Sequence, residues 1–142
     1  MSIKLFKSSG LLLLIFLFSR LILLFGMDVK FEYDWIFQMW HFIDIDLLKN
    51  KLLESVYYFH YQPPLFNLFL GLVHKQEIVS ANFVLQTFFY CLTYIMGLII
   101  FYTSNIAGNK KIYSYLFAIF FYIFPETIIY ENWPIYRSEE HT

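Results

Sequence analysis

Three long runs of apolar residues divide the chain, at positions 11–26, 82–104 and 112–130. A helix needs roughly 17–25 such residues to cross a membrane, so the second and third runs are long enough, and the first becomes so with its flanks. Pro125 lies inside the third run and predicts a kink or an end of the helix there. We therefore expect three membrane-spanning helices.

A fourth apolar run, at 65–73, follows two adjacent prolines, Pro63 and Pro64. The prolines favour an extended approach at Gln62 and a helix that starts at about Pro64. Such a helix would be about 14 Å long at ~1.5 Å per residue. Because the hydrocarbon core is about 30 Å thick, we expect this segment to lie in the membrane interface or to dip in and return.

Lysines outside the apolar runs predict the orientation. Lys4 and Lys7 precede the first run, and Lys110 and Lys111 separate the second from the third. If the run at 65–73 does not cross, all four lysines face the cytoplasm, as the positive-inside rule requires. The predicted fold is all-α: a polytopic membrane protein with three transmembrane helices, a cytoplasmic N-terminus and a long external first loop at 27–78.

That loop is mixed in polarity and should carry interfacial amphipathic helices. Over residues 34–44 a helical wheel gathers the polar side chains on one face and two tryptophans with other apolar residues on the opposite face. Tryptophan suits the interface between water and lipid. Residues 44–58 are expected to form a turn followed by a second polar helix or loop.

The composition agrees with a membrane protein. Of the 142 residues, 59% are hydrophobic and only 15% are charged, whereas soluble chains average roughly 45–50% and about 25%. The net charge of -1 gives no basic face for nucleic acid. Cys91 is the one cysteine, so no internal disulfide can form.

The external loop resembles the first external loop of integral-membrane glycosyltransferases that use lipid-phosphate-linked sugars. These include protein O-mannosyltransferases and the lipid A aminoarabinose transferase. Two elements carry the resemblance: Asp34, at the start of the predicted surface helix, and the segment YQPPLFN at 61–67. The chain departs from the family pattern in two places. Trp35 follows the aspartate, and Gln62 stands where the family often has histidine, with His60 two positions earlier.

The resemblance implies a transferase that moves a sugar from a polyprenyl- or dolichyl-phosphate donor to an acceptor on the non-cytoplasmic face. One acid in the loop carries the chemistry in that family, and here it would be Asp34, with Glu32 as the fallback. A carboxylate at the interface is wet enough to meet the acceptor, and partial desolvation raises its basicity. The alternative is that Asp34 only caps the helix it begins.

Four further residues are candidates for substrate binding: Arg20, His60, Glu126 and Glu131. Arg20 lies within the first span, where a cation costs at least ~2.5 kcal/mol unless it snorkels or finds an anion. Snorkelling is slightly favoured over pairing with a lipid phosphate or a loop carboxylate. His60 could contact a phosphate or sugar, or be merely interfacial. The two glutamates could line the acceptor site or hold a divalent cation with Asp34.

The expected partners are the bilayer and the lipid-linked donor, in a bacterial plasma membrane rather than the endoplasmic reticulum; no cofactor beyond that cation is predicted. The alternative function is a non-enzymatic membrane protein, such as a transporter or an assembly subunit. The spans show no evident charged pair of the kind transporters use, which disfavours the transporter. Neither HExxH, CxxC nor GxSxG is present, so zinc hydrolysis and serine-hydrolase chemistry lack their usual motifs.

The last six residues, 137–142, read Arg-Ser-Glu-Glu-His-Thr and resemble the in-frame translation of a common sequencing adapter. We therefore expect residues 1–136 to be the N-terminal part of the glycosyltransferase, inactive alone, and the tail to be non-native. Re-reading the source DNA tests this, since genuine genomic codons through 137–142 would contradict it.

Overall fold

The computed structural model describes residues 2–29, 45–58, 64–74 and 78–132. Within these ranges the regular secondary structure is entirely helical, in seven helices, as predicted for an all-α chain. The chain divides into two compact units, each described by itself. Unit 1 comprises Met1–Lys30 and Phe89–Asn132, and unit 2 comprises Phe31–Phe88 and Trp133–Thr142. The predicted surface helix at 34–44 lies outside the described residues.

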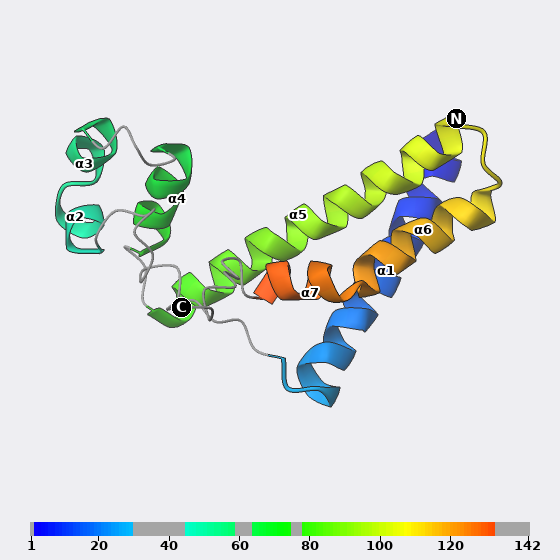
Figure 1. Cartoon of the computed structure of the whole chain (residues 1–142), viewed down its shortest axis with the longest axis horizontal. Helices are drawn as coiled ribbons and strands as arrows, with labels where there is room; N and C mark the ends of the chain where they lie inside the picture. Colours follow the sequence, from blue (N-terminus) through cyan, green and yellow to red (C-terminus); the bar gives the residue numbers. More distant parts are fainter. Residues whose placement is uncertain (1, 30–44, 59–63, 75–77, 133–142) are drawn as a thin grey trace, which may run out of the picture. The chain divides into compact units, whose positions relative to one another are not determined.

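Unit 1 is an up-down-up arrangement of α1 (Ser2–Gly26), the C-terminal part of α5 (Ile78–Ile106) and α6 (Lys111–Ile123). The Tyr94 hydroxyl of α5 donates to the Ser9 carbonyl of α1 at 2.9 Å. Further along α1, Phe16 meets Tyr90 edge-to-face at 6.1 Å. Contacts that advance along α1 while receding along α5 show that the two helices are antiparallel. The N-terminal end of α1 and the α5–α6 loop consequently lie at the same end of unit 1 (Figure 1).

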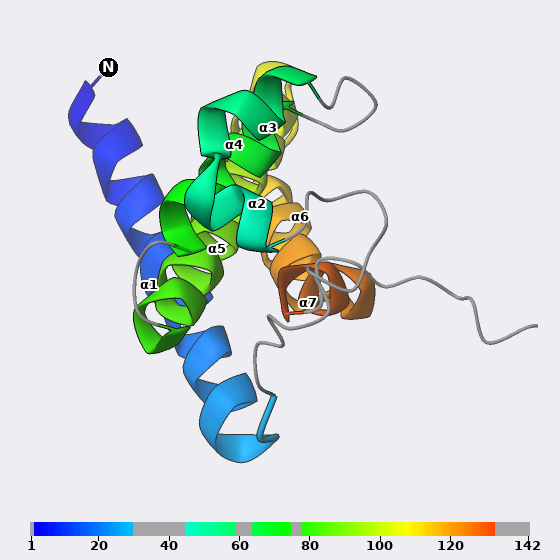
Figure 2. The same ribbon diagram turned by 90° about the vertical axis from the view of Figure 1, so that its left-hand side faces the viewer.

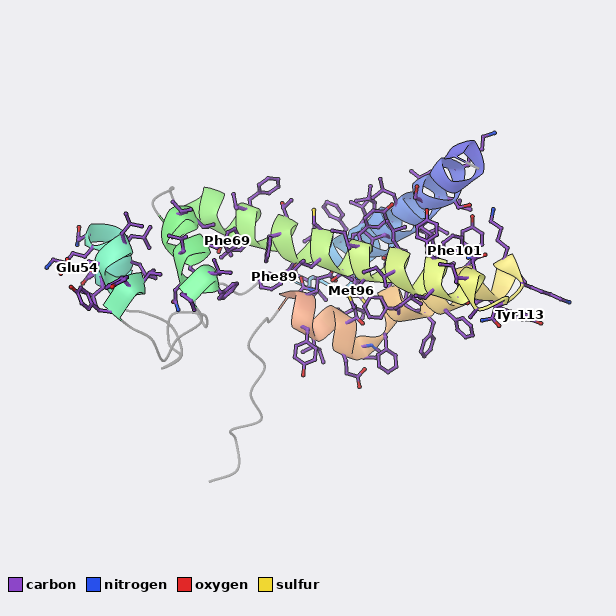
Figure 3. All side chains as sticks on the ribbon, turned by 90° about the horizontal axis from the view of Figure 1, so that it is seen from above. Glu54, Phe69, Phe89, Met96, Phe101 and Tyr113 are labelled. Atoms are coloured by element: carbon purple, nitrogen blue, oxygen red, sulfur yellow. The ribbon has the colours of Figure 1, made fainter. Side chains whose placement is uncertain are left out.

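The core of unit 1 forms where α1, α5 and α6 meet. Phe101 of α5 packs on Tyr115 of α6 with ring centroids 4.7 Å apart. Phe101 lies towards the end of α5 that leads into the α5–α6 loop (Figure 3). The Ser114 hydroxyl donates to the Ser104 hydroxyl at 3.0 Å across the same hairpin. The buried side chains of this core are Leu12, Phe16, Phe101, Ala118 and Tyr122.

The third apolar run is broken, as Pro125 predicts. α6 ends at Ile123 and α7 (Pro125–Asn132) begins two residues later, at an angle of 50° to it. Proline has no N–H to continue the ladder, and its ring clashes with the preceding turn. In the part of the chain that is described, two helices are long and apolar enough to cross a membrane, Lys7–Gly26 and Asn82–Ile106, and the bent pair makes a third if it acts as one span.

Both long helices extend past the predicted boundaries. α1 begins at Ser2 and α5 at Ile78, several residues before the apolar runs start. Hydropathy locates the apolar stretch, but a helix continues through polar residues such as Lys7 and Ser80 when nothing stops it. No proline lies within either helix to end it sooner.

Unit 2 is a small helical cluster of α2 (Ile45–Asn50), α3 (Leu52–Tyr58), α4 (Pro64–His74) and the first turns of α5 (Figure 2). Its core is apolar and consists of Leu48, Leu52, Leu70, Val73 and Leu85. The Gly71 backbone lies directly against the Leu52 side chain, so α3 and α4 pack closely. The Phe69 ring packs on Phe88 at 4.6 Å.

Two predictions for this region have different outcomes. α4 begins at Pro64 and is an apolar helix too short to be a span, as predicted. Residues 45–58 form two short helices separated by Lys51, rather than a turn and one helix. Leu48 of α2 and Leu52 of α3 both enter the apolar core of unit 2.

Candidate functional site

The candidate site in the described residues is a buried ion pair between α1 and α7. The Arg20 Nε lies 2.7 Å from Oε2 of Glu131, and the two side chains are 4% and 0% exposed. Both residues come from the set predicted to bind substrate. Because both lie in unit 1, the pair joins segments that are far apart in sequence but within one compact body.

The spacing of α1 explains why Arg20 is inside. Ser8, Leu12, Phe16 and Arg20 follow one another at four-residue intervals, and all four are buried. Residues four apart stack on one face of a helix. The guanidinium therefore projects from the same face as the apolar core. The slight preference for snorkelling was wrong, since the side chain turns into the bundle and pairs with a carboxylate.

The broken third run supplies a second partner. Arg20 Nη1 donates to the Tyr122 backbone carbonyl at 3.0 Å and to the Ser19 hydroxyl at 3.0 Å. Tyr122 lies in the last turn of α6, where carbonyls lose their intrahelical donors. The break at Phe124–Pro125 thus exposes a backbone acceptor deep in the bundle, and the arginine satisfies it.

Aromatic rings enclose the guanidinium. Its central carbon lies 4.5 Å from the Phe16 ring centroid and 5.9 Å from that of Tyr90. A cation over an aromatic face gains about 0.5–2 kcal/mol, the larger values applying where water is excluded. Phe16 also packs on Tyr122 at 5.1 Å, so the rings connect the ion pair to the core of unit 1.

The close packing around Tyr122 depends on a glycine. A Cβ added at Gly97 of α5 would overlap the Tyr122 ring, and the Tyr122 hydroxyl donates to the Tyr94 carbonyl of α5 at 3.2 Å. Small residues let membrane helices approach in this way. Gly97 therefore helps to fix the end of α6 whose carbonyl receives Arg20.

The polar groups at the site are incompletely satisfied. Asn132, next to Glu131, is 1% exposed and donates from Nδ2 to the Ile128 carbonyl at 2.9 Å. Among the residues the structure describes, Arg20 Nη2, Glu131 Oε1 and Asn132 Oδ1 are buried without a hydrogen-bond partner. Buried polar atoms normally have partners. The guanidinium thus keeps an open donor beside the carboxylate, and Thr93 of α5 also lies close to Glu131.

The other predicted site residues are not brought to this pair. Glu126 lies in the first turn of α7 and is exposed. Asp34, Glu32 and His60 lie outside the described residues, so their positions relative to Arg20 are untested. Among residues 2–29, 45–58, 64–74 and 78–132 no group of three His, Cys, Asp or Glu is arranged to hold a metal ion.

Sequence reasoning missed the pairing of Arg20 with Glu131, and with it one inference was wrong. A candidate span, α1, and the bent helix pair do contribute a buried charged pair, so its supposed absence no longer disfavours a transporter. Two signals were present: an arginine in helical phase with Ser8, and an acid six residues after a proline that breaks the third run. Comparisons with protein-family models, curated proteins and solved structures found no match for this chain.

Proposed function

We propose that the chain acts in glycosyl transfer at a membrane, taking a sugar from a polyprenyl- or dolichyl-phosphate donor on the non-cytoplasmic side. The observation that carries the proposal is Arg20, an arginine buried among membrane helices with one guanidinium nitrogen unbonded. Ionisable residues inside spans are costly and usually mark a substrate or ion pathway. Arginine is the residue best suited to phosphate, because its planar fork can contact two oxygens.

The proposed topology follows from the arrangement of unit 1. Three spans, with the bent pair as the third, place the N-terminal end of α1 and the α5–α6 loop on one side. These two segments carry Lys4, Lys7, Lys110 and Lys111, which assigns that side to the cytoplasm. Residues 27–78 then form the external loop, with Asp34 on the side where a lipid-linked sugar is used.

In the proposed reaction Asp34 is the general base that takes the proton from the acceptor hydroxyl. The acceptor oxygen attacks the anomeric carbon of the sugar, and the bond from that carbon to the phosphate oxygen breaks. The lipid phosphate leaves with the electron pair of that bond. Arg20 stabilises its charge, and Glu131 holds the guanidinium in place until the phosphate binds. Glu126, exposed on α7, and His60 are candidates to contact sugar or acceptor.

A binding measurement tests the arginine without knowledge of the sugar. Undecaprenyl phosphate and undecaprenol are added to the purified chain in detergent, and lipid binding is followed by native mass spectrometry. Removing one charge-assisted hydrogen bond, about 1.5–3 kcal/mol, corresponds to roughly a tenfold or greater loss of affinity. We expect Arg20→Gln to lose affinity for the phosphate lipid alone. Equal binding of both lipids by the unaltered chain would refute the phosphate site.

A transfer assay tests Asp34. Because residues 1–136 are expected to be inactive alone, membranes that contain the intact protein receive a radiolabelled lipid-phosphate sugar, and labelled product is counted. Asp34→Asn should abolish transfer while expression and membrane insertion persist. Glu54→Gln, which neutralises an exposed acid on α3, is the control and should retain transfer. Retained transfer in Asp34→Asn with loss in Glu32→Gln would move the base to Glu32.

The buried ion pair also favours a second candidate, a non-enzymatic transporter. Charged pairs inside a bundle are typical of proton and solute pathways. Flux into proteoliposomes separates the two, because a transporter moves a solute without consuming a lipid-linked sugar. Sugar transfer without solute flux supports the enzyme, and the reverse supports the transporter.

A further inference from the structure

The break between α6 and α7 has the geometry of a hinge. Phe124 is extended, with φ -66° and ψ 132°, and it alone separates the two helices. Its N–H bonds back to the Phe121 carbonyl at 3.4 Å, a long contact, while Pro125 offers no N–H at all. The backbone ladder across the break is therefore weak, and something else must hold the 50° angle.

α7 buries no apolar side chain completely, although Ile128 and Ile129 are half-buried. All eight of its residues are described, and the two that are buried are Glu131 and Asn132. Both are polar. Helices normally attach to their neighbours by burying an apolar stripe. In α7 the fully buried contacts are polar, so Glu131 contributes a large part of its attachment.

Arg20 contacts both sides of the break. Its Nη1 donates to the Tyr122 carbonyl at the end of α6, and its Nε lies 2.7 Å from the Glu131 carboxylate at the end of α7. The guanidinium is planar and its donors keep fixed directions. α6 and α7 each bind a different nitrogen of this rigid group, and this fixes the angle between the two helices. The group is itself fixed, because α1 buries it beside Phe16.

We propose that Arg20 is a clamp that sets the angle between α6 and α7, and that α7 moves about Phe124–Pro125 when the guanidinium is lost or engaged elsewhere. The clamp does not depend on glycosyl transfer. It needs only the two contacts of Arg20 and the polar attachment of α7. An anion that competed with Glu131 for the guanidinium would open it.

Distance measurements between one spin label on α6 and one on α7 test the clamp. Labels are attached to Phe117→Cys on α6 and Tyr130→Cys on α7, both exposed positions, in the full 142-residue chain with Cys91→Ser. The parent should give one narrow distance distribution in nanodiscs by double electron–electron resonance. We expect Arg20→Gln to lose that single distance and to gain a broad second population. An unchanged distribution would overturn the clamp.

Further variants separate the clamp from general loosening. Tyr94→Phe removes the hydrogen bond from α5 to the Ser9 carbonyl of α1, which also joins distant parts of the sequence but does not involve the α6–α7 break. This variant should keep the narrow distance distribution. Arg20→Lys keeps the charge but cannot place fixed donors on both helices, so it should still broaden the distribution. A parent-like result for Arg20→Lys, or equal broadening in Tyr94→Phe, would contradict the proposal. If Arg20→Gln does not fold, judged by circular dichroism, the double variant Arg20→Gln, Glu131→Gln leaves no buried charge unpaired, releases α7 and gives the same readout.

Discussion

Neutralising Glu131 should destabilise the protein strongly, because it leaves the buried Arg20 guanidinium without a counter-ion. The Arg20 side chain is 4% exposed, and its carboxylate partner lies 2.7 Å away. Glu131→Gln keeps the shape of the side chain and removes only the charge. The guanidinium would then lie among Phe16, Tyr90 and the Tyr122 carbonyl with no counter-ion.

The magnitude follows from these contacts. Breaking a buried pair by removing one partner costs about 3–5 kcal/mol, since the remaining charge is uncompensated. Here the Tyr122 carbonyl and the Phe16 ring still interact with the cation, which favours the lower end of that range, about 3 kcal/mol. The double variant Arg20→Gln, Glu131→Gln has no stranded charge. It should be more stable than Glu131→Gln alone, with a coupling energy of about 0.5–3 kcal/mol.

The assay is reversible unfolding in mixed micelles, with far-UV circular dichroism recorded as dodecyl sulfate is added. Glu126→Gln is the matched control, because it neutralises an exposed acid on the same helix. It should change the free energy of unfolding by no more than about 0.5 kcal/mol. Glu131→Gln within that limit would refute the argument, as would additive costs in the double variant.

Two other predictions concern packing and orientation. Gly97→Ala should lower the free energy of unfolding by about 1–3 kcal/mol in the same assay, since the new methyl overlaps the Tyr122 ring. Gly10→Ala is the control: its methyl meets no atom within 4 Å, so the variant should be neutral or slightly stabilising. For orientation, the native cysteine is replaced by serine and single cysteines are introduced at Asn109, in the α5–α6 loop, or at Asn50, in α2. An impermeant maleimide added to intact cells should label position 50 and spare position 109; labelling at 109 would contradict the three-span topology.

The fold was largely predictable because its main determinants are local. Each determinant can be read from neighbouring residues. They are the apolar runs long enough to span, the proline that breaks the third run and the proline that starts α4. Helix ends were less predictable. The residues before position 82 are mixed in polarity, yet α5 begins at Ile78, since a helix in a packed protein continues until a chemical stop and not until the apolar run ends.

The pairing within the site could not be predicted in the same way. Arg20 and Glu131 meet because α1 and the bent third run pack together, and α1 is apolar on nearly every side, so its sequence does not reveal which face is buried. The Tyr122 carbonyl is a backbone acceptor and has no sequence signature of its own. Only the proline three residues later indicates that a carbonyl near it will lack its helical donor.

The depth of the ion pair connects the clamp to the proposed substrate. From Lys7, at the lysine-bearing end, α1 rises about 20 Å to Arg20 at ~1.5 Å per residue. In a hydrocarbon core about 30 Å thick, that leaves roughly 10 Å to the opposite surface. α6 contributes about 20 Å, and α7, inclined by 50° to it, adds about 8 Å along the same direction. With the bent pair counted as one span, Glu131 would lie near the far surface, with Arg20 beneath it. A phosphate group on that surface that bound Nη2 could also take the place of the carboxylate at the guanidinium. Binding of the donor and release of α7 would then be one event, and Arg20→Gln should abolish donor binding while leaving α7 released whether or not the donor is present.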